Sequence, residues 1–84
     1  MTNPNSLVHS LRNKSAHDLI KALERDNFCL RRTTRTGGRI YVHSDQRRVV
    51  IHYHHSSDRF TRKVLSSILD GTRWTETDIK RLKL

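Results

Sequence analysis

Residues 31–55 concentrate the side chains that could do chemistry in this protein. The stretch contains six arginines and four of the six histidines of the chain. Imidazole is the side chain that gives or takes a proton most readily near neutral pH, and arginine is well suited to binding phosphate. This density of arginine and histidine needs an explanation beyond folding.

The histidines at the end of this stretch also raise the question of a metal site. Residues two apart on a strand point to the same face, so His52 and His54 could share a metal ion while His55 points away. No carboxylate or cysteine stands at a useful spacing beside them, so we expect no metal. The pair Gly37-Gly38 lacks the rest of a phosphate-binding P-loop pattern and predicts a bend. We expect no small-molecule cofactor.

The charge of the whole chain points to a polyanionic partner. Its 84 residues carry 17 Lys and Arg against 8 Asp and Glu, a formal net charge of +9. Such an excess favours encounter with nucleic acid or with an acidic protein. Cys29 is the only cysteine, which suits a reducing compartment, and we expect it to pack as a small hydrophobic residue.

The sequence contains no apolar run that approaches the length of a membrane span, and its N-terminal residues lack a cleavable signal pattern. We therefore expect a soluble, cytoplasmic protein with no membrane partner. A chain of this length has room for one small core. We expect that core within a single domain over residues 15–84. Residues 1–14 predict an N-terminal tail or a loosely docked helical turn, with Leu7, Val8 and Leu11 as its only apolar anchors.

Two helical patterns flank the stretch rich in arginine and histidine. Ser15 and Asp18 match a helix-capping pair, and apolar residues then recur at helical spacing, which predicts a helix over 16–26 that Asn27 ends. A second helix is predicted over 61–70, with Gly71 as its stop. Thr75 opens a further short helix, and Trp74 is expected to anchor it to the core.

Between these helices the chain predicts three strands. Apolar residues alternate with polar ones over 28–34, 39–44 and 47–54. The loop of residues 44–46 is too short for a parallel crossover, so the last two strands form an antiparallel hairpin. The predicted fold class is α+β: a helix, a three-stranded antiparallel sheet, a helix and a short C-terminal helix, packed in two layers.

This order, together with particular residues, resembles the HicA (YcfA-like) toxins of toxin–antitoxin modules. The similarity covers about residues 16–82 and is carried by GGRIYVHSDQRRVVIHYHHSSDRFTRKVLSSIL and TRWTETDIKRL. The family pattern runs from a helix into Gly-(Ser/Gly)-His-x-(Ile/Leu)-(Tyr/Phe), then His-Pro-Asp-Gly-Arg, a strand ending in His and another helix. The resemblance implies a fold like the double-stranded-RNA-binding domain, metal-independent cleavage of mRNA and a HicB-like antitoxin as partner.

One position departs from the family pattern in a way that bears on activity. Gly37 matches the second small residue, and His43 matches the histidine of the loop motif, but the catalytic histidine of the family falls on Gly38. Milder departures lie in the turns, at Thr36, Ser44 and Gln46. Glycine can neither take the proton of the 2′-hydroxyl nor protonate the leaving 5′-oxygen.

Three explanations fit the glycine: an inactivated variant, a toxin that has lost its activity naturally, and a toxin in which another histidine serves. The intact remainder of the scaffold favours an inactivated variant. The possible substitutes are His43, His52, His54 and His55. The residues expected to contact RNA are Arg35, Arg39, Tyr41, Arg47, Arg48, Arg59, Arg62 and Lys63. Two functions remain open beside the ribonuclease: a non-catalytic RNA-binding module and a protein that titrates an antitoxin.

Overall fold

Alternating β-branched and aromatic residues form a three-stranded antiparallel sheet. In the computed structural model, which describes residues 4–84, the strands are β1 (Cys29–Thr33), β2 (Gly38–Val42) and β3 (Arg48–His52), in the order β1-β2-β3. The last two strands form the predicted hairpin, in which Tyr41 pairs with Val49. The β1–β2 pairing contains an irregularity between Leu30 and Arg32.

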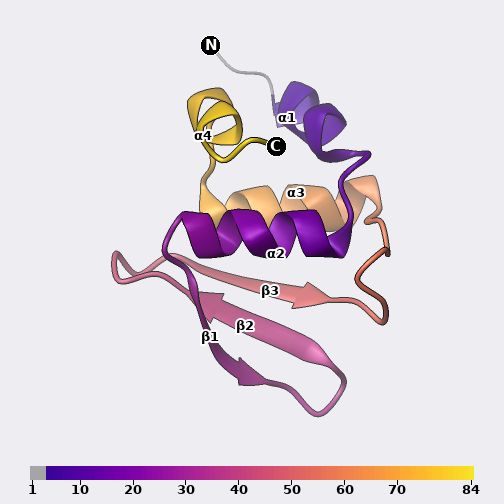
Figure 1. The fold of residues 1–84 in the computed structure, drawn as a ribbon, viewed down its shortest axis with the longest axis vertical. Coiled ribbons are helices and arrows are strands. Elements are labelled where there is room, and N and C mark those ends of the chain that lie inside the picture. The colour runs from indigo at the N-terminus through magenta and orange to yellow at the C-terminus, as the bar shows by residue number, and fades with distance from the viewer. Residues whose placement is uncertain (1–3) are drawn as a thin grey trace.

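Helices cover one face of this sheet and build the core. Figure 1 shows α2 (Ala16–Arg25) and α3 (Arg62–Thr72) along the sheet, with α1 (Pro4–Leu11) and α4 (Glu76–Arg81) on their far side. Within residues 4–84, no helix lies on the opposite face of the sheet. The predicted α+β class is confirmed. The structure has a further layer of helices, α1 and α4, beyond the two layers that were expected. The buried apolar side chains of the core come from all four helices and from β2 and β3.

The first predicted helix, now α2, begins and ends as its sequence indicates. The Ser15 side chain accepts a hydrogen bond from the Asp18 backbone N–H, and the Asp18 carboxylate accepts one from the backbone N–H of Ser15, at 3.1 Å. After the last turn, Asn27 adopts a left-handed conformation with φ of 69°, which asparagine tolerates better than most residues. The prediction of both ends is confirmed.

The N-terminal segment follows the helical alternative of its prediction, and it is packed more firmly than a loosely docked turn. Residues 4–11 form α1, which packs against α3, and Val8 and Leu11 are buried in the core. These two residues lie three apart and therefore share one side of a helix. Such a short pattern is weak in the sequence, and the partner surface on α3 is what gives it a place to pack.

Cys29 is also placed differently from the expectation, because it is exposed. It lies on edge strand β1 opposite Val42. Alternation along β2 puts this pair on the face opposite to that of Tyr41, whose side chain packs in the core. All five residues of β1 are exposed, including Leu30. The apolar pattern of this strand overstated its burial because alternation in a sequence does not show whether a strand lies at the edge of a sheet.

Gly71 does not stop α3, which continues to Thr72 and ends at Arg73 in a left-handed conformation. The glycine serves the packing of α3 on β3. A Cβ atom at position 71 would lie 2.5 Å from the backbone oxygen of Arg48 and 3.1 Å from the Cβ of Val49. No helix within residues 4–84 is both long and apolar enough to cross a membrane.

Candidate functional site

Gly38 and His52 are direct partners at one end of the β2–β3 hairpin, which we name the open end. Both belong to the face of the sheet that no helix covers. A Cβ atom built on Gly38 would lie 2.6 Å from Nε2 of His52 and 2.8 Å from its Cε1. The tip of the imidazole therefore occupies the space in which a side chain at position 38 would begin. Gly38 itself is buried, whereas His52 is exposed.

Hydroxyl groups from the turn before β2 complete this corner. The backbone N–H of Gly38 donates a hydrogen bond to Oγ1 of Thr34 at 2.8 Å, and the hydroxyls of Thr34 and Thr36 lie 3.3 Å apart. Gly37 makes the turn possible, since its φ of 89° is a conformation that side chains disfavour. The turn fixes two hydroxyls beside the imidazole of His52.

A hollow of about 230 Å³ opens beside His52. Its lining combines the turn before β2 with the segment that follows β3: Thr36, Gly37, His52, Tyr53, His54, Asp58, Arg59 and Phe60. The segment is held against the start of α2, because the backbone N–H of Ala16 donates to the carbonyl of Asp58 at 2.8 Å. Arg59 donates from Nε to the carbonyl of Asn13 at 3.3 Å.

Asp58 is the carboxylate of this hollow, and the protein uses it to shape the loop. One of its oxygens accepts hydrogen bonds from the backbone N–H groups of His54 and His55, at 2.9 and 3.0 Å. These bonds, with that from His55 the larger influence, lower the pKa of Asp58. The carboxylate is therefore an anchor for the chain after β3 and stays ionised at neutral pH.

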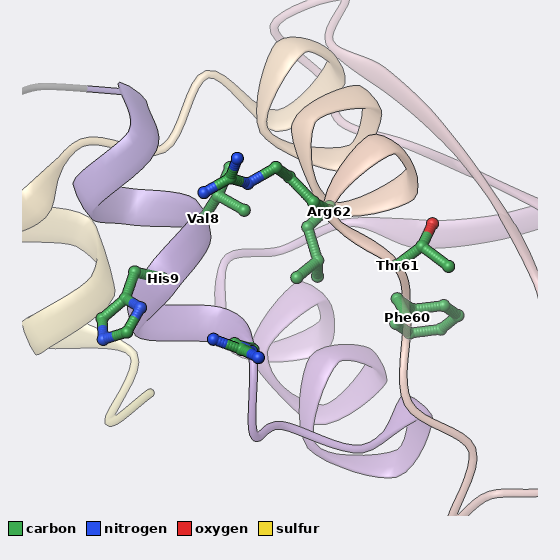
Figure 2. Close-up of a pocket in the computed structure, with 7 residues that line it drawn as sticks. Val8, His9, Phe60, Thr61 and Arg62 are labelled. Atoms are coloured by element: carbon green, nitrogen blue, oxygen red, sulfur yellow. The ribbon is translucent and has the colours of Figure 1, made fainter.

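A second hollow, of about 340 Å³, lies where α1 faces the start of α3 (Figure 2). Val8, His9 and Arg12 line it from the N-terminal side, and Phe60, Thr61, Arg62 and Leu65 from the other. Phe60 lines both hollows. The two hollows therefore lie on either side of Phe60, one at the N-terminal end of α3, where backbone N–H groups favour anions, and one beside the imidazole of His52.

The strands themselves add positive charge without any negative charge. Residues 29–33, 38–42 and 48–52 contain four arginines and no Asp or Glu. Arg31, Arg32 and Arg48 line a shallow depression together with Ile40 and Val42. Of the residues predicted to contact RNA, five are exposed and stand around the open end or along these surfaces: Arg35, Arg48, Arg59, Arg62 and Lys63.

The other three predicted RNA contacts are engaged inside the protein. Tyr41 is only 4% exposed and packs in the core, so it is not placed to stack on a base; burial raises the pKa of its hydroxyl. The guanidinium of Arg39 lies 4.6 Å from the centre of the Tyr53 ring. The prediction for Tyr41 was wrong because tyrosine alternates on the strand face that meets the helices.

Arg47 lies at the opposite end of the hairpin, the closed end, formed by the loop of residues 43–47. Its guanidinium lies 3.2 Å from a carboxylate oxygen of Asp26 and donates from Nε to Asp45 at 2.7 Å and from Nη1 to the carbonyl of Thr72 at 2.6 Å. It also lies over the ring of Phe28. With these partners Arg47 is a structural residue, and its contact with RNA stays a prediction.

Asp26 is the buried centre of the closed end. It accepts hydrogen bonds from Nε1 of Trp74 at 2.9 Å and from Arg81 at 2.7 Å, and it pairs with Arg47. Burial on its own raises the pKa of this carboxyl, but the bonds from Arg81 and Trp74 and the charge of Arg47 outweigh it, so the pKa lies below its usual value. Trp74 is buried, as expected of an anchor.

The four histidines considered as substitutes lie in different surroundings. His43 belongs to the closed end, where its ring contacts Phe28 and its Nδ1 accepts a hydrogen bond from the backbone N–H of Asp45. It lies five positions after Gly38, just beyond the end of β2, which is roughly 16 Å along an extended chain. His54 and His55 follow the end of β3 at His52, so the pairing of His52 with His54 on one strand face does not form.

Sequence reasoning missed three contributors to the open end: Thr34, Thr36 and Phe60. The run Thr-Thr-Arg-Thr before the glycines was a signal, since hydroxyls beside a tight turn commonly bind backbone groups. No pattern in the sequence pointed to Phe60, because its position between the two hollows depends on how the loop after β3 folds. No group of three or more His, Cys, Asp or Glu side chains within the described part of the chain could hold a metal ion.

Comparison with known families is informative. A family model described as the HicA toxin of bacterial toxin–antitoxin systems matches residues 16–73, well over half of the chain. The matched region runs from the first residue of α2 to the C-cap of α3 and includes both ends of the hairpin. The α+β arrangement is consistent with the double-stranded-RNA-binding-like fold of that family. No curated protein matches the chain significantly.

Proposed function

The chain belongs to the HicA toxin family, and from this premise we propose that it is a metal-independent ribonuclease that cleaves mRNA and is neutralised by an antitoxin. The observation that carries the proposal is the open end of the hairpin. There, an imidazole, two threonine hydroxyls and Arg59 meet beside a hollow of about 230 Å³. This set of groups suits a phosphodiester bond better than a neutral metabolite.

The exposed arginines and the lysine would bind the RNA backbone. Arg59 lines the hollow beside His52, while Arg62 and Lys63 stand in the first turn of α3. Contacts of this kind position a nucleic acid and say little about which bases are read. Since each neutralised phosphate releases counterions, RNA affinity should fall steeply with rising salt.

The partner that we propose is a HicB-like antitoxin with an acidic surface. The uncovered face of the sheet carries Arg31, Arg32 and Arg48 around the apolar side chains of Ile40 and Val42. A complementary acidic protein would associate rapidly and in a salt-sensitive way. By covering the arginines it would exclude RNA from the same face.

The proposed activity is tested by comparing this chain with the Gly38→His variant. Purified proteins are incubated with mRNA in the presence of EDTA, and growth is followed after induced expression. Cleavage and growth arrest by either protein support a ribonuclease toxin. The variant needs a movement of the His52 side chain, because the new Cβ would lie within 3 Å of the imidazole. A rotation of that side chain can supply the space.

One specific observation favours a second candidate function, namely the glycine at the family's catalytic position. If neither protein cleaves RNA and both bind it with a steep salt dependence, the chain is an RNA-binding module. If neither cleaves nor binds RNA, while the chain binds an acidic antitoxin, titration of that antitoxin is its function. Loss of general acid–base help typically slows such a reaction on the order of 100- to 10,000-fold, so the assay must detect slow cleavage.

A further inference from the structure

The open end contains an imidazole in the space where the Cβ atom of a side chain at position 38 would lie. Gly38 and His52 are paired across β2 and β3, and directly opposed residues of an antiparallel pair point to the same face. The nearest atoms to a Cβ at position 38 are Nε2 and Cε1 of His52, followed by Oγ1 of Thr34 at 2.9 Å. The ring of His52 thus points across the strands toward Gly38.

Resting on the proposed ribonuclease function, we propose that His52 is the catalytic base of this chain, and that the catalytic imidazole is supplied from β3 instead of β2. The absence of a side chain at Gly38 is what leaves room for the ring. Thr34 and Thr36 provide hydroxyls beside it, and Arg59 lies in the same hollow to meet a phosphate.

The other histidines lack this combination. His43 lies at the closed end, in contact with Phe28 and Asp45. His54 shares the hollow, but it lies beyond the end of β3, in the loop that Asp58 anchors. A side chain on a strand is held more firmly than one on a loop, and proton transfer depends on such positioning.

The chemical step can be written with all atoms accounted for. Nε2 of His52 takes the proton of a ribose 2′-hydroxyl, and the 2′-oxygen attacks the adjacent phosphorus. The new bond joins the 2′-oxygen to phosphorus, and the bond from phosphorus to the 5′-oxygen breaks. The leaving 5′-oxygen takes a proton from water, and the resulting hydroxide recovers the proton held by His52. The products are a 2′,3′-cyclic phosphate and a 5′-hydroxyl end, without oxidation or reduction.

The test compares this chain with His52→Gln, which keeps a polar side chain of similar length but cannot serve as the base. His17→Gln is the matched control, since it removes an exposed imidazole from α2, outside the hollow. Cleavage of a single-stranded RNA oligonucleotide is measured in EDTA, and RNA affinity and urea unfolding are measured alongside. We expect His52→Gln to slow cleavage on the order of 100- to 10,000-fold with RNA affinity unchanged, and His17→Gln to stay within a few-fold of the parent.

An exchange variant makes the test sharper. Gly38→His combined with His52→Gly moves the imidazole from β3 back to β2, and we expect it to cleave at a rate near that of the parent. Unchanged cleavage by His52→Gln would overturn the inference and leave the ribonuclease proposal standing. So would an inactive parent beside an active Gly38→His variant. If the parent, Gly38→His and the exchange variant all fold and none cleaves RNA, the proposed function itself fails.

Discussion

Both ends of the β2–β3 hairpin carry basic side chains, but these side chains have different partners at the two ends. At the closed end Arg47 meets the carboxylates of Asp26 and Asp45 within the protein. At the open end His52 stands beside a glycine and threonine hydroxyls. The carboxylate there, Asp58, is already bound by two backbone N–H groups.

The difference teaches that the density of basic residues does not locate a nucleic-acid site by itself. Arg47 and Arg48 are neighbours in the sequence, yet only Arg48 is exposed on the sheet face that no helix covers. A cation whose charge is met by a buried carboxylate is required by the fold, because removing either partner leaves the other charge without compensation. A cation without such a partner is available to a ligand, and the predictions below separate these two roles.

The largest effect is expected at the closed end, from Asp26→Asn. Removing the charge leaves the guanidinium of Arg47, which is 18% exposed, without its buried partner. Breaking a buried ion pair on one side typically costs about 3–5 kcal/mol, and the free energy of unfolding in urea should fall by that order. Asp70→Asn, at an exposed position of α3, is the control. An equal loss in both variants would contradict the comparison.

The same carboxylate should give the protein a specific sensitivity to acid. The pKa of Asp26 is lowered in the folded state, so its contribution to stability is complete above the pKa of the unfolded chain, about 4. The contribution is lost as the pH falls through that value and through the lower pKa of the folded state. Urea midpoints of the parent and Asp26→Asn should therefore converge below pH 4. A constant difference at all pH values would contradict this assignment.

Close packing of α3 on β3 at the closed end should make Gly71→Ala destabilising. Alanine favours a helix over glycine by about 1 kcal/mol, but its Cβ would lie 2.5 Å from the backbone oxygen of Arg48. Overpacking of this kind costs about 1–3 kcal/mol, so a net loss in thermal stability is expected. Ser67→Ala, on the exposed side of the same helix, should raise stability slightly. A gain in both would show that the contact relaxes freely.

Neighbouring arginines provide the most direct comparison of the two roles. Arg48→Gln should leave urea unfolding nearly unchanged and reduce the slope of log affinity for RNA against log salt by about 1. Arg47→Gln should lower the stability to urea and leave the salt slope of RNA affinity nearly unchanged, because the guanidinium of Arg47 is bound to Asp26, Asp45 and the carbonyl of Thr72. RNA affinity is measured by fluorescence anisotropy over a salt series. Equal salt slopes for the two variants would contradict the division.

The smallest effect is expected in the loop that closes the hairpin. Gln46 adopts a φ of 83°, a conformation that costs a residue with a side chain about 1 kcal/mol relative to glycine. Gln46→Gly should therefore raise the free energy of unfolding by up to that amount without changing RNA affinity. Thermal unfolding followed by circular dichroism checks the first part. A loss of stability would show that the Gln46 side chain makes a contribution of its own.

The sequence predicts the fold better than it predicts the site. Capping residues such as Ser15 and alternation such as Val49 and Ile51 act locally, so their outcome could be read from neighbouring positions. The burial of Leu11 and the exposure of Cys29 depend on which surfaces meet in space. Periodicity shows a face, but it does not show what covers that face.

At the candidate site, the residue types indicated which side chains could take part, but the sequence did not show which residues they contact. Histidine and arginine at positions 52 and 59 were singled out from chemistry alone, and both line the hollow. The engagement of Arg47 by Asp26 joins residues 21 positions apart, and Trp74 and Arg81 complete the cluster from the far end of the chain. Such long-range pairs leave no pattern in a single sequence.

The pairing of Gly38 with His52 bears on how members of a protein family are compared. Each column of a sequence alignment compares one position of one strand. A column that expects histidine at position 38 of β2 would therefore classify this chain as an inactive enzyme. The register of the hairpin places the imidazole of β3 next to the position where that side chain would begin. If His52 is the base, as proposed, family members that lack the aligned histidine would be sorted by the residue opposite it on the neighbouring strand, and this criterion needs only their sequences.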